Sequence, residues 1–166
     1  MFSHFKSKEQ LQLQTLEHAR SRFVDVIVRP ALAAPRGEPR LRALVEHWRT
    51  WDSVGLEGGC IFTAAAFELG EQPGPLRDAL VRSELDWLEL LGSVSAAAVR
   101  EGQFRPDLDP EQLAFEIHGV LLSHHYASRL LADQQAGRRT ALALDRIIAG
   151  ARDTEIHTGA AATAVP

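Results

Sequence analysis

The chain has 166 residues, of which 45% are hydrophobic and 24% are charged, and its formal net charge is −4 at pH 7. This composition is ordinary for one soluble globular domain, and no apolar run reaches the roughly 18 residues that a membrane span requires. The polar start is unlike a secretory signal, and the single cysteine, Cys60, excludes an internal disulfide, so we expect a cytoplasmic protein without a membrane partner.

Basic residues are concentrated near the N-terminus. Residues 1–30 hold five basic and three acidic residues, whereas the remainder holds 13 basic and 19 acidic residues. Any contact with nucleic acid should therefore lie at the N-terminus, where cations displace counterions from phosphates. An asymmetry this small also arises by chance, so it needs support from a motif.

The first long helix is predicted over residues 8–32. Ser7 is a good N-cap, and Gln10 three residues later completes a capping-box pattern. The apolar residues near one face are Leu11, Leu16, Phe23 and Ile27. Pro30 lacks a backbone donor and should kink or end the helix.

Three more helices are predicted over residues 39–53, 60–69 and 75–101, between turns rich in Gly and Pro. Pro39 suits the first turn of its helix, and Gly102 stands where a left-handed residue is needed. Apolar residues at helical spacing are Leu41, Leu44, Val45, Trp48 and Trp51 in the first of these helices, and Leu76, Leu80, Trp87, Leu91, Val94 and Ala98 in the last.

The clearest helix start in the chain lies at Asp109, an N-cap followed by Pro110 at the first helical position and Gln112 at the third. This helix should run to about residue 132. One apolar face holds Leu113, Ile117, Val120 and Leu121, and a second is formed by Phe115, Leu122, Tyr126 and Leu130. A surface helix needs only one buried stripe, so the second face should meet another partner.

A last helix is predicted over about residues 136–152, followed by a disordered tail over residues 153–166 with too little apolar bulk to order itself. No stretch alternates apolar and polar residues between turns as a strand would. The chain is therefore predicted to be all-α.

The N-terminal segment carries a recognisable motif. Residues 2–11 read Phe-Ser-His-Phe-Lys-Ser-Lys-Glu-Gln-Leu. They resemble Tyr-x-His-Phe-x-Ser-Lys-Glu-x-Leu, with which the TetR family of bacterial transcriptional repressors closes its DNA-reading helix-turn-helix and opens the next helix. Phe2 replaces the usual Tyr, and the matching residues are His4, Phe5, Ser7, Lys8, Glu9 and Leu11. Segments 58–66, 73–78 and 102–110 extend the resemblance to about Arg152.

The resemblance implies a TetR-like C-terminal bundle of about six helices. Residues 1–6 would be the remnant of the recognition helix, and residues 7–152 the ligand-binding and dimerisation domain. A complete family head has three helices, so operator DNA is expected as a partner only if the full head is present. The remaining phosphate contacts would be His4, Lys6 and Lys8.

The resemblance also implies a homodimer, because in the family the last two long helices pair with those of a second chain as a four-helix bundle. The residues expected at this interface are Leu121, His124, His125, Leu144 and Ile148.

A pocket for a small-molecule effector of unknown identity is expected if the helices stack as in the family. Its predicted lining consists of Trp48, Trp51, Phe62, Phe67, Trp87, Phe115 and His118. Polar groups for orienting a ligand would come from His118, Cys60, Thr63 or Tyr126. Each of these aromatic residues taken alone is more often a core residue, so the prediction rests on the set.

Metal and enzyme functions are weaker alternatives. His118, His124 and His125 lack the spacing of a compact chelating group, so no metal and no cofactor are expected. Cys60 lies near a helix start but has no identified base, which favours packing over a nucleophilic role. A helical-bundle enzyme, a metal-binding protein and a head-less interaction protein that forms heterodimers remain as alternatives to a ligand-controlled repressor.

Overall fold

The computed structural model describes residues 2–54, 59–69 and 73–152, with side chains from Lys8 onward except that of Val54. Every regular element in these ranges is a helix, which confirms the all-α prediction. The elements are α1 (Phe2–Phe23), η1 (Val24–Val28), α2 (Arg29–Leu32), α3 (Glu38–Val54), α4 (Ile61–Leu69), α5 (Pro75–Arg100), α6 (Pro110–His125), η2 (Tyr126–Leu130) and α7 (Ala136–Arg152).

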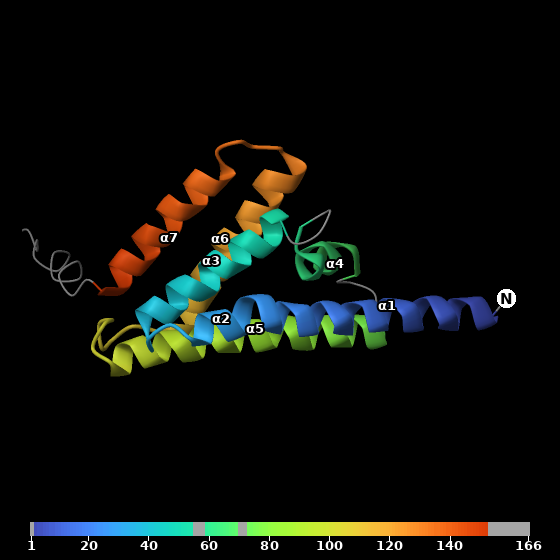
Figure 1. Ribbon diagram of the computed structural model, residues 1–166, viewed down its shortest axis with the longest axis horizontal. Helices are drawn as coiled ribbons and strands as arrows, with labels where there is room; N and C mark the ends of the chain where they lie inside the picture. The colour runs from blue at the N-terminus through green and yellow to red at the C-terminus, as the bar shows by residue number, and fades with distance from the viewer. Residues whose placement is uncertain (1, 55–58, 70–72, 153–166) are drawn as a thin grey trace, which may run out of the picture.

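The two long helices α1 and α5 lie side by side, and the N-terminal part of α1 extends beyond the start of α5 (Figure 1). Helix α6 packs between α5 and α7, while α3 contacts both α5 and the turn η1. The short helix α4 packs against α5 and α1.

Helix α1 begins earlier than predicted. Ser7 lies within α1, which runs from Phe2 to Phe23 without a break, so the prediction of an N-cap at Ser7 and a helix start at Lys8 is wrong. A Ser can stand inside a helix at a small cost in propensity, so a local capping pattern does not compel a new helix. The domain division after residue 6 stays a prediction.

Pro30 shapes the end of the first helix. Its ring would clash with the carbonyl of Val26 in a regular helix, and it has no N–H to donate there. The chain instead widens into the π-helical turn η1, in which the Arg29 N–H donates to the Val24 carbonyl. The predicted kink at Pro30 therefore takes the form of a wide turn, and the helix ends at Leu32 as expected.

The later helix boundaries agree with the predictions to within two residues, apart from the end of α6. Asp109 caps α6 by accepting hydrogen bonds from the backbone N–H groups of Glu111 and Gln112. Gly102 follows α5 with a φ of +69°. Helix α6 itself ends at His125 and continues as the π-helical turn η2.

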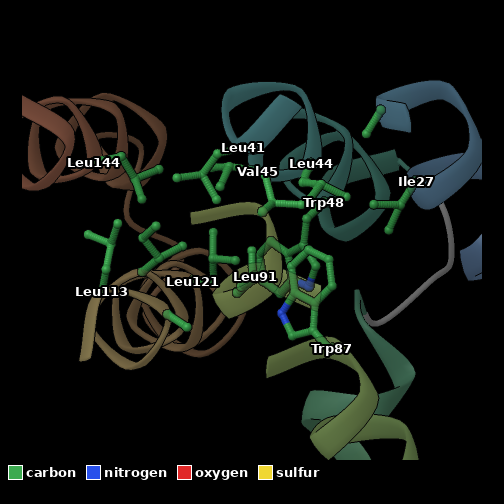
Figure 2. Packing of buried hydrophobic residues seen from close by; sticks show 14 of the residues in the cluster. Ile27, Leu41, Leu44, Val45, Trp48, Trp87, Leu91, Leu113, Leu121 and Leu144 are labelled. Atoms are coloured by element: carbon green, nitrogen blue, oxygen red, sulfur yellow. The ribbon is translucent and has the colours of Figure 1, made fainter. Parts of the chain in front are cut away.

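The core joins α3, α5, α6 and α7 (Figure 2). The largest fully buried apolar side chains are Ile27, Leu41, Leu44, Leu91, Ile117, Leu121 and Ile148. They come from five different elements, so the bundle has one continuous apolar interior. In Figure 2, Trp48 and Trp87 lie at the edge of this cluster, where the candidate site begins.

Gly37, immediately before α3, should not tolerate alanine. Its φ is +85°, and a Cβ there would lie 2.1 Å from Oε1 of Gln103. That oxygen accepts the Glu38 N–H at 2.6 Å, and Nε2 of Gln103 donates to the Arg36 carbonyl at 3.2 Å. The left-handed conformation alone costs about 1–2 kcal/mol for a residue with a Cβ.

Gly37→Ala should therefore lower the urea midpoint of unfolding, measured by circular dichroism. Gly150→Ala is the control, because Gly150 lies within α7 with open space around its Cα and should be unchanged or slightly stabilised. An unchanged midpoint for Gly37→Ala would contradict the assigned backbone conformation.

Candidate functional site

A cavity of about 190 Å³ lies among α1, η1, α3, the start of α4, α5 and α6. Its apolar and aromatic lining comprises Phe23, Val24, Val28, Trp48, Phe62, Trp87 and Leu90. Its polar lining comprises Arg20, Cys60, Thr63, Ser83, Glu84, Asp86 and His118. An apolar space with a few polar groups is the usual character of a small-molecule site.

Phe23 of α1 is the centre of the aromatic wall. Its ring meets Trp87 at 5.3 Å between centroids, Phe62 at 5.7 Å and Trp51 at 6.0 Å, each in an edge-to-face arrangement. Such pairs are a favourable geometry for aromatic rings and fix their relative orientation. One side chain of α1 therefore contacts α3, α4 and α5.

Two ionisable groups, Glu84 of α5 and His118 of α6, lie close together in the cavity wall. Oε2 of Glu84 lies 3.8 Å from Nε2 of His118, which is too long for a hydrogen bond. Burial raises the pKa of the Glu84 carboxyl and lowers the pKa of the His118 imidazole. Both shifts favour the neutral forms, and Nδ1 of His118 is buried without a hydrogen-bond partner.

The other charged groups of the cavity neutralise each other. Nη2 of Arg20 donates to Oδ2 of Asp86 at 2.6 Å, and both side chains are about half exposed. This pair links α1 to α5 at the surface. Because it is solvated, we assign it little stabilisation, within the 0–1 kcal/mol typical of exposed pairs.

Cys60 borders the cavity as a buried thiol. Burial raises the pKa of this thiol, and hydrogen bonds involving Thr63 offset only part of that effect. A protonated thiol is a poor nucleophile. The environment of Cys60 therefore favours packing over catalysis.

A second polar cluster lies directly behind Cys60 and is centred on Asp52 of α3. Oδ1 of Asp52 accepts the Cys60 N–H at 2.9 Å and lies 2.6 Å from Nδ1 of His125. Oδ2 of Asp52 lies 3.8 Å from Nε2 of His124, whose Nδ1 is 2.9 Å from the hydroxyl of Thr140. This Asp52 cluster joins α3, the start of α4, α6 and α7 within one chain.

The predicted dimer-interface residues are buried within one chain. His124 and His125 are buried and held by partners in their own chain. Leu121, Leu144 and Ile148 are buried in the core of the same chain. These five side chains therefore offer little surface to a second chain, and their place at a dimer interface stays a prediction.

The predicted pocket residues are brought together only in part. Trp48, Phe62, Trp87 and His118 border the cavity, as do Cys60 and Thr63. Trp51 is buried but packs against Phe23 and does not border the cavity. Phe67 and Phe115 are 74% and 70% exposed, and Tyr126 is 51% exposed, so the expectation that they face this interior is wrong.

Sequence reasoning missed the contributions of α1 and the acidic residues of α5. The sequence predicts Phe23 only as part of the apolar face of the first helix, and it places Arg20, Glu84 and Asp86 in no site. The apolar neighbours of Glu84 at helical spacing, Leu80, Trp87 and Leu91, were a usable signal, because they place Glu84 near the edge of a buried stripe.

Of the three predicted DNA contacts, the structure describes the side chain of Lys8 alone. The side chains of His4 and Lys6 lie outside the described part of the chain, and Lys8 is exposed on α1. Among the described residues, no three His, Cys, Asp or Glu side chains are placed to hold one metal ion. No described helix is both long enough and apolar enough to cross a membrane.

The buried histidines predict loss of stability in mild acid. Burial lowers the pKa of His118 and, against the opposing effect of Asp52, that of His124, from an ordinary value of 6.5. Below pH 6.5 the unfolded chain then binds more protons than the folded chain, so the free energy of unfolding falls as pH decreases. Above that pH this contribution is constant.

The urea midpoint should therefore decrease between pH 7.5 and pH 5.5, and His124→Gln should show a smaller decrease than the unchanged chain. His18→Gln, on an exposed part of α1, is the matched control. The raised pKa of Glu84 increases the free energy of unfolding as pH decreases. This contribution is the same in all three proteins, so it cancels when their changes in urea midpoint are compared. An equal decrease in His124→Gln would contradict the prediction.

A family model described as the C-terminal domain of tetracyclin repressor-like proteins matches residues 37–144. The matched range extends from the turn before α3 into α7 and includes most of the cavity wall. The comparison with curated proteins gave no match.

Proposed function

The chain belongs to the tetracyclin repressor-like family through its C-terminal domain, and we propose that it is the ligand-sensing and dimerisation body of a transcriptional repressor. A small molecule in the cavity would control DNA binding by a reading head to which residues 1–6 would belong. Residues 7–152 would form the sensing body, acting in the cytoplasm.

The observation that carries this proposal is the direct contact of the cavity with α1. Arg20 and Phe23 of α1, and Val24 and Val28 of η1, border the same space as Trp48 and Trp87. Helix α1 also contains His4, Lys6 and Lys8, our proposed phosphate contacts. A ligand that favours one position of α1 would thereby change the spacing of two reading heads, and DNA would in turn change the affinity for that ligand.

Dimerisation is proposed through the outer surface of α6 and α7. Phe115, Gly119 and Tyr126 are exposed, and Leu122 between them is partly exposed, at helical spacing along α6 and η2. Leu130 is 68% exposed and Leu142 of α7 is 47% exposed. An apolar stripe of this kind is suited to an isologous contact with the same surface of a second chain. Its residues are more exposed than those first assigned to the interface.

Light scattering at micromolar concentration should give twice the chain mass of 18.3 kDa. Phe115→Glu should shift the mass to that of one chain, because a carboxylate would be buried without a partner in the interface. Phe67→Glu, an equally exposed phenylalanine on α4, is the matched control and should remain dimeric. A single-chain mass for the unchanged protein would contradict the dimer.

Coupling of the cavity to α1 can be tested with spin labels. We would attach one label per chain at Gln14→Cys, exposed on α1, and measure the distance between labels with and without 2-phenylethanol, a one-ring neutral probe. Labels at Glu101→Cys, at the end of α5, are the control. We expect a changed distance for the α1 pair alone. Saturation of the cavity without such a change would contradict the sensing mechanism.

A further inference from the structure

The cavity has one acidic group that its surroundings do not neutralise. Arg20 is engaged by Asp86 at 2.6 Å, and among the described residues the basic group placed near Glu84 is His118, at 3.8 Å. Burial disfavours the charged form of that imidazole. Glu84 is 25% exposed in its side chain and borders the open space of the cavity. A buried carboxylate without a cation is costly unless a partner is supplied.

The walls beside Glu84 suit a cation that carries an aromatic ring. The rings of Trp48, Phe62 and Trp87 border the same cavity. Indole and phenyl faces attract a nearby ammonium group through their quadrupoles, and they pack favourably with another ring at their edges. In the cavity lining, Arg20 is the permanent cation, and Asp86 already holds it. The lining therefore does not suit an anionic ligand.

We propose that the cavity selects a small arylalkylamine, an aromatic ring with an amine on a short alkyl arm. The amine would bind as its ammonium ion to the Glu84 carboxylate, with the ring among Trp48, Phe62 and Trp87. This inference rests on the proposed sensing function and names the ligand class of that site. Glu84 is the residue that determines specificity for charge, and the aromatic side chains determine specificity for the flat apolar part.

The volume limits the size of this amine. A dry cavity of about 150 Å³ holds benzene, so a cavity of about 190 Å³ accepts one ring with a short side arm. 2-Phenylethylamine has this size, and 2-phenylethanol and phenylacetate are its neutral and anionic counterparts. The three probes differ mainly in the charge presented to Glu84.

Binding of the amine should weaken as pH falls. Burial favours the protonated form of Glu84 in the free protein, whereas the bound ammonium ion requires the ionised form. The other ionisable groups bordering the cavity are Arg20, Cys60, Asp86 and His118. Protonation of His118 in acid would also repel the ammonium ion, so both groups weaken amine binding as pH falls. The alcohol has no such charge, and its affinity should change less.

The test is titration of the full chain with each probe at pH 7.5. Binding is measured by isothermal calorimetry and by the fluorescence of the cavity tryptophans. We expect 2-phenylethylamine to bind at least ten-fold more tightly than 2-phenylethanol, and phenylacetate to bind most weakly. Glu84→Gln should remove the preference for the amine while leaving the affinity for the alcohol within about two-fold. The amide of Gln has nearly the size of the carboxylate but carries no charge. Glu89→Gln, exposed on the same helix, should bind like the unchanged chain.

The outcomes separate this inference from the proposed function. If 2-phenylethanol binds as tightly as the amine and still changes the distance between α1 labels, the charge selectivity is overturned and the sensing role stands. If Glu84→Gln leaves amine affinity unchanged, Glu84 is not the recognition group. If no probe binds, both the amine class and the cavity as a sensing site are overturned.

Discussion

Asp52→Ala should lower the free energy of unfolding by about 3–5 kcal/mol, because it removes one partner from a buried ionisable cluster. Asp52 is completely buried, and its Oδ1 accepts the Cys60 N–H while lying 2.6 Å from Nδ1 of His125. Loss of the carboxylate leaves both groups enclosed without a partner. A buried donor that loses its acceptor costs about 1–3 kcal/mol by itself.

The backbone beside Asp52 packs closely against its side chain. A Cβ on Gly59, whose φ is +81°, would lie 2.8 Å from Oδ1 of Asp52 and 2.9 Å from Cε1 of His125. Nη2 of Arg129 also donates to the carbonyl of Asp52. Asp52 thus joins Cys60 to His125 of α6 through its side chain and contacts Arg129 of η2 through its backbone carbonyl.

Urea denaturation followed by tryptophan fluorescence measures this effect. Asp145→Ala is the control, because Asp145 forms a solvated ion pair with Arg42 and should cost less than about 1 kcal/mol. Asp52→Asn should fall between the two, since an amide retains one acceptor oxygen. A loss below 1 kcal/mol for Asp52→Ala would show that the Asp52 cluster does not hold α3, α4 and α6 together.

Phe23→Ala should cost about 3–5 kcal/mol, the range for truncating a large aromatic side chain in a packed interior. The ring of Phe23 touches Trp51, Phe62 and Trp87 from three other helices. It is partly buried and borders the cavity, so the lower end of this range is the better expectation. Its removal would enlarge the cavity and release α1 from the aromatic wall.

Two measurements separate stability from coupling in Phe23→Ala. The free energy of unfolding from urea denaturation should fall, whereas in Phe67→Ala, which truncates a largely exposed ring, it should change by less than about 0.5 kcal/mol. Amide hydrogen exchange should then show lower protection in α1 than in α6, because the lost contacts attach α1 to the body. Equal loss of protection in both helices would indicate general destabilisation and would contradict a specific role in holding α1.

Most helices could be located from the sequence because their signals act within one turn. Asp109, Pro110 and Gln112 define the start of α6 through contacts between residues two and three apart. Gly102 follows α5 in the left-handed conformation that a residue with a Cβ avoids. The same local reasoning failed at Ser7, where a capping pattern is present but the helix continues through it.

The orientation of side chains on short or evenly apolar helices could not be predicted from spacing. Helix α4 is apolar on most sides, so periodicity alone does not tell Phe62, which borders the cavity, from Phe67, which is exposed. On α6, the apolar pattern correctly indicated a second face. It did not indicate that His124 and His125 belong to the enclosed side, which is decided by Thr140 and Asp52 from other helices.

The sequence by itself determined an all-helical chain and the bounds of most helices, because caps, prolines and apolar periodicity act within a turn or two. The motif over residues 2–11 also indicated the family. Only the tertiary structure decided that Glu84 borders a cavity and that Phe23 joins α1 to it. A glutamate on a long helix is ordinarily solvated, and its burial depends on α1, α4 and α6 covering the same face of α5. Burial and the resulting shift in the Glu84 pKa arise from contacts between residues distant in sequence, which local spacing does not encode.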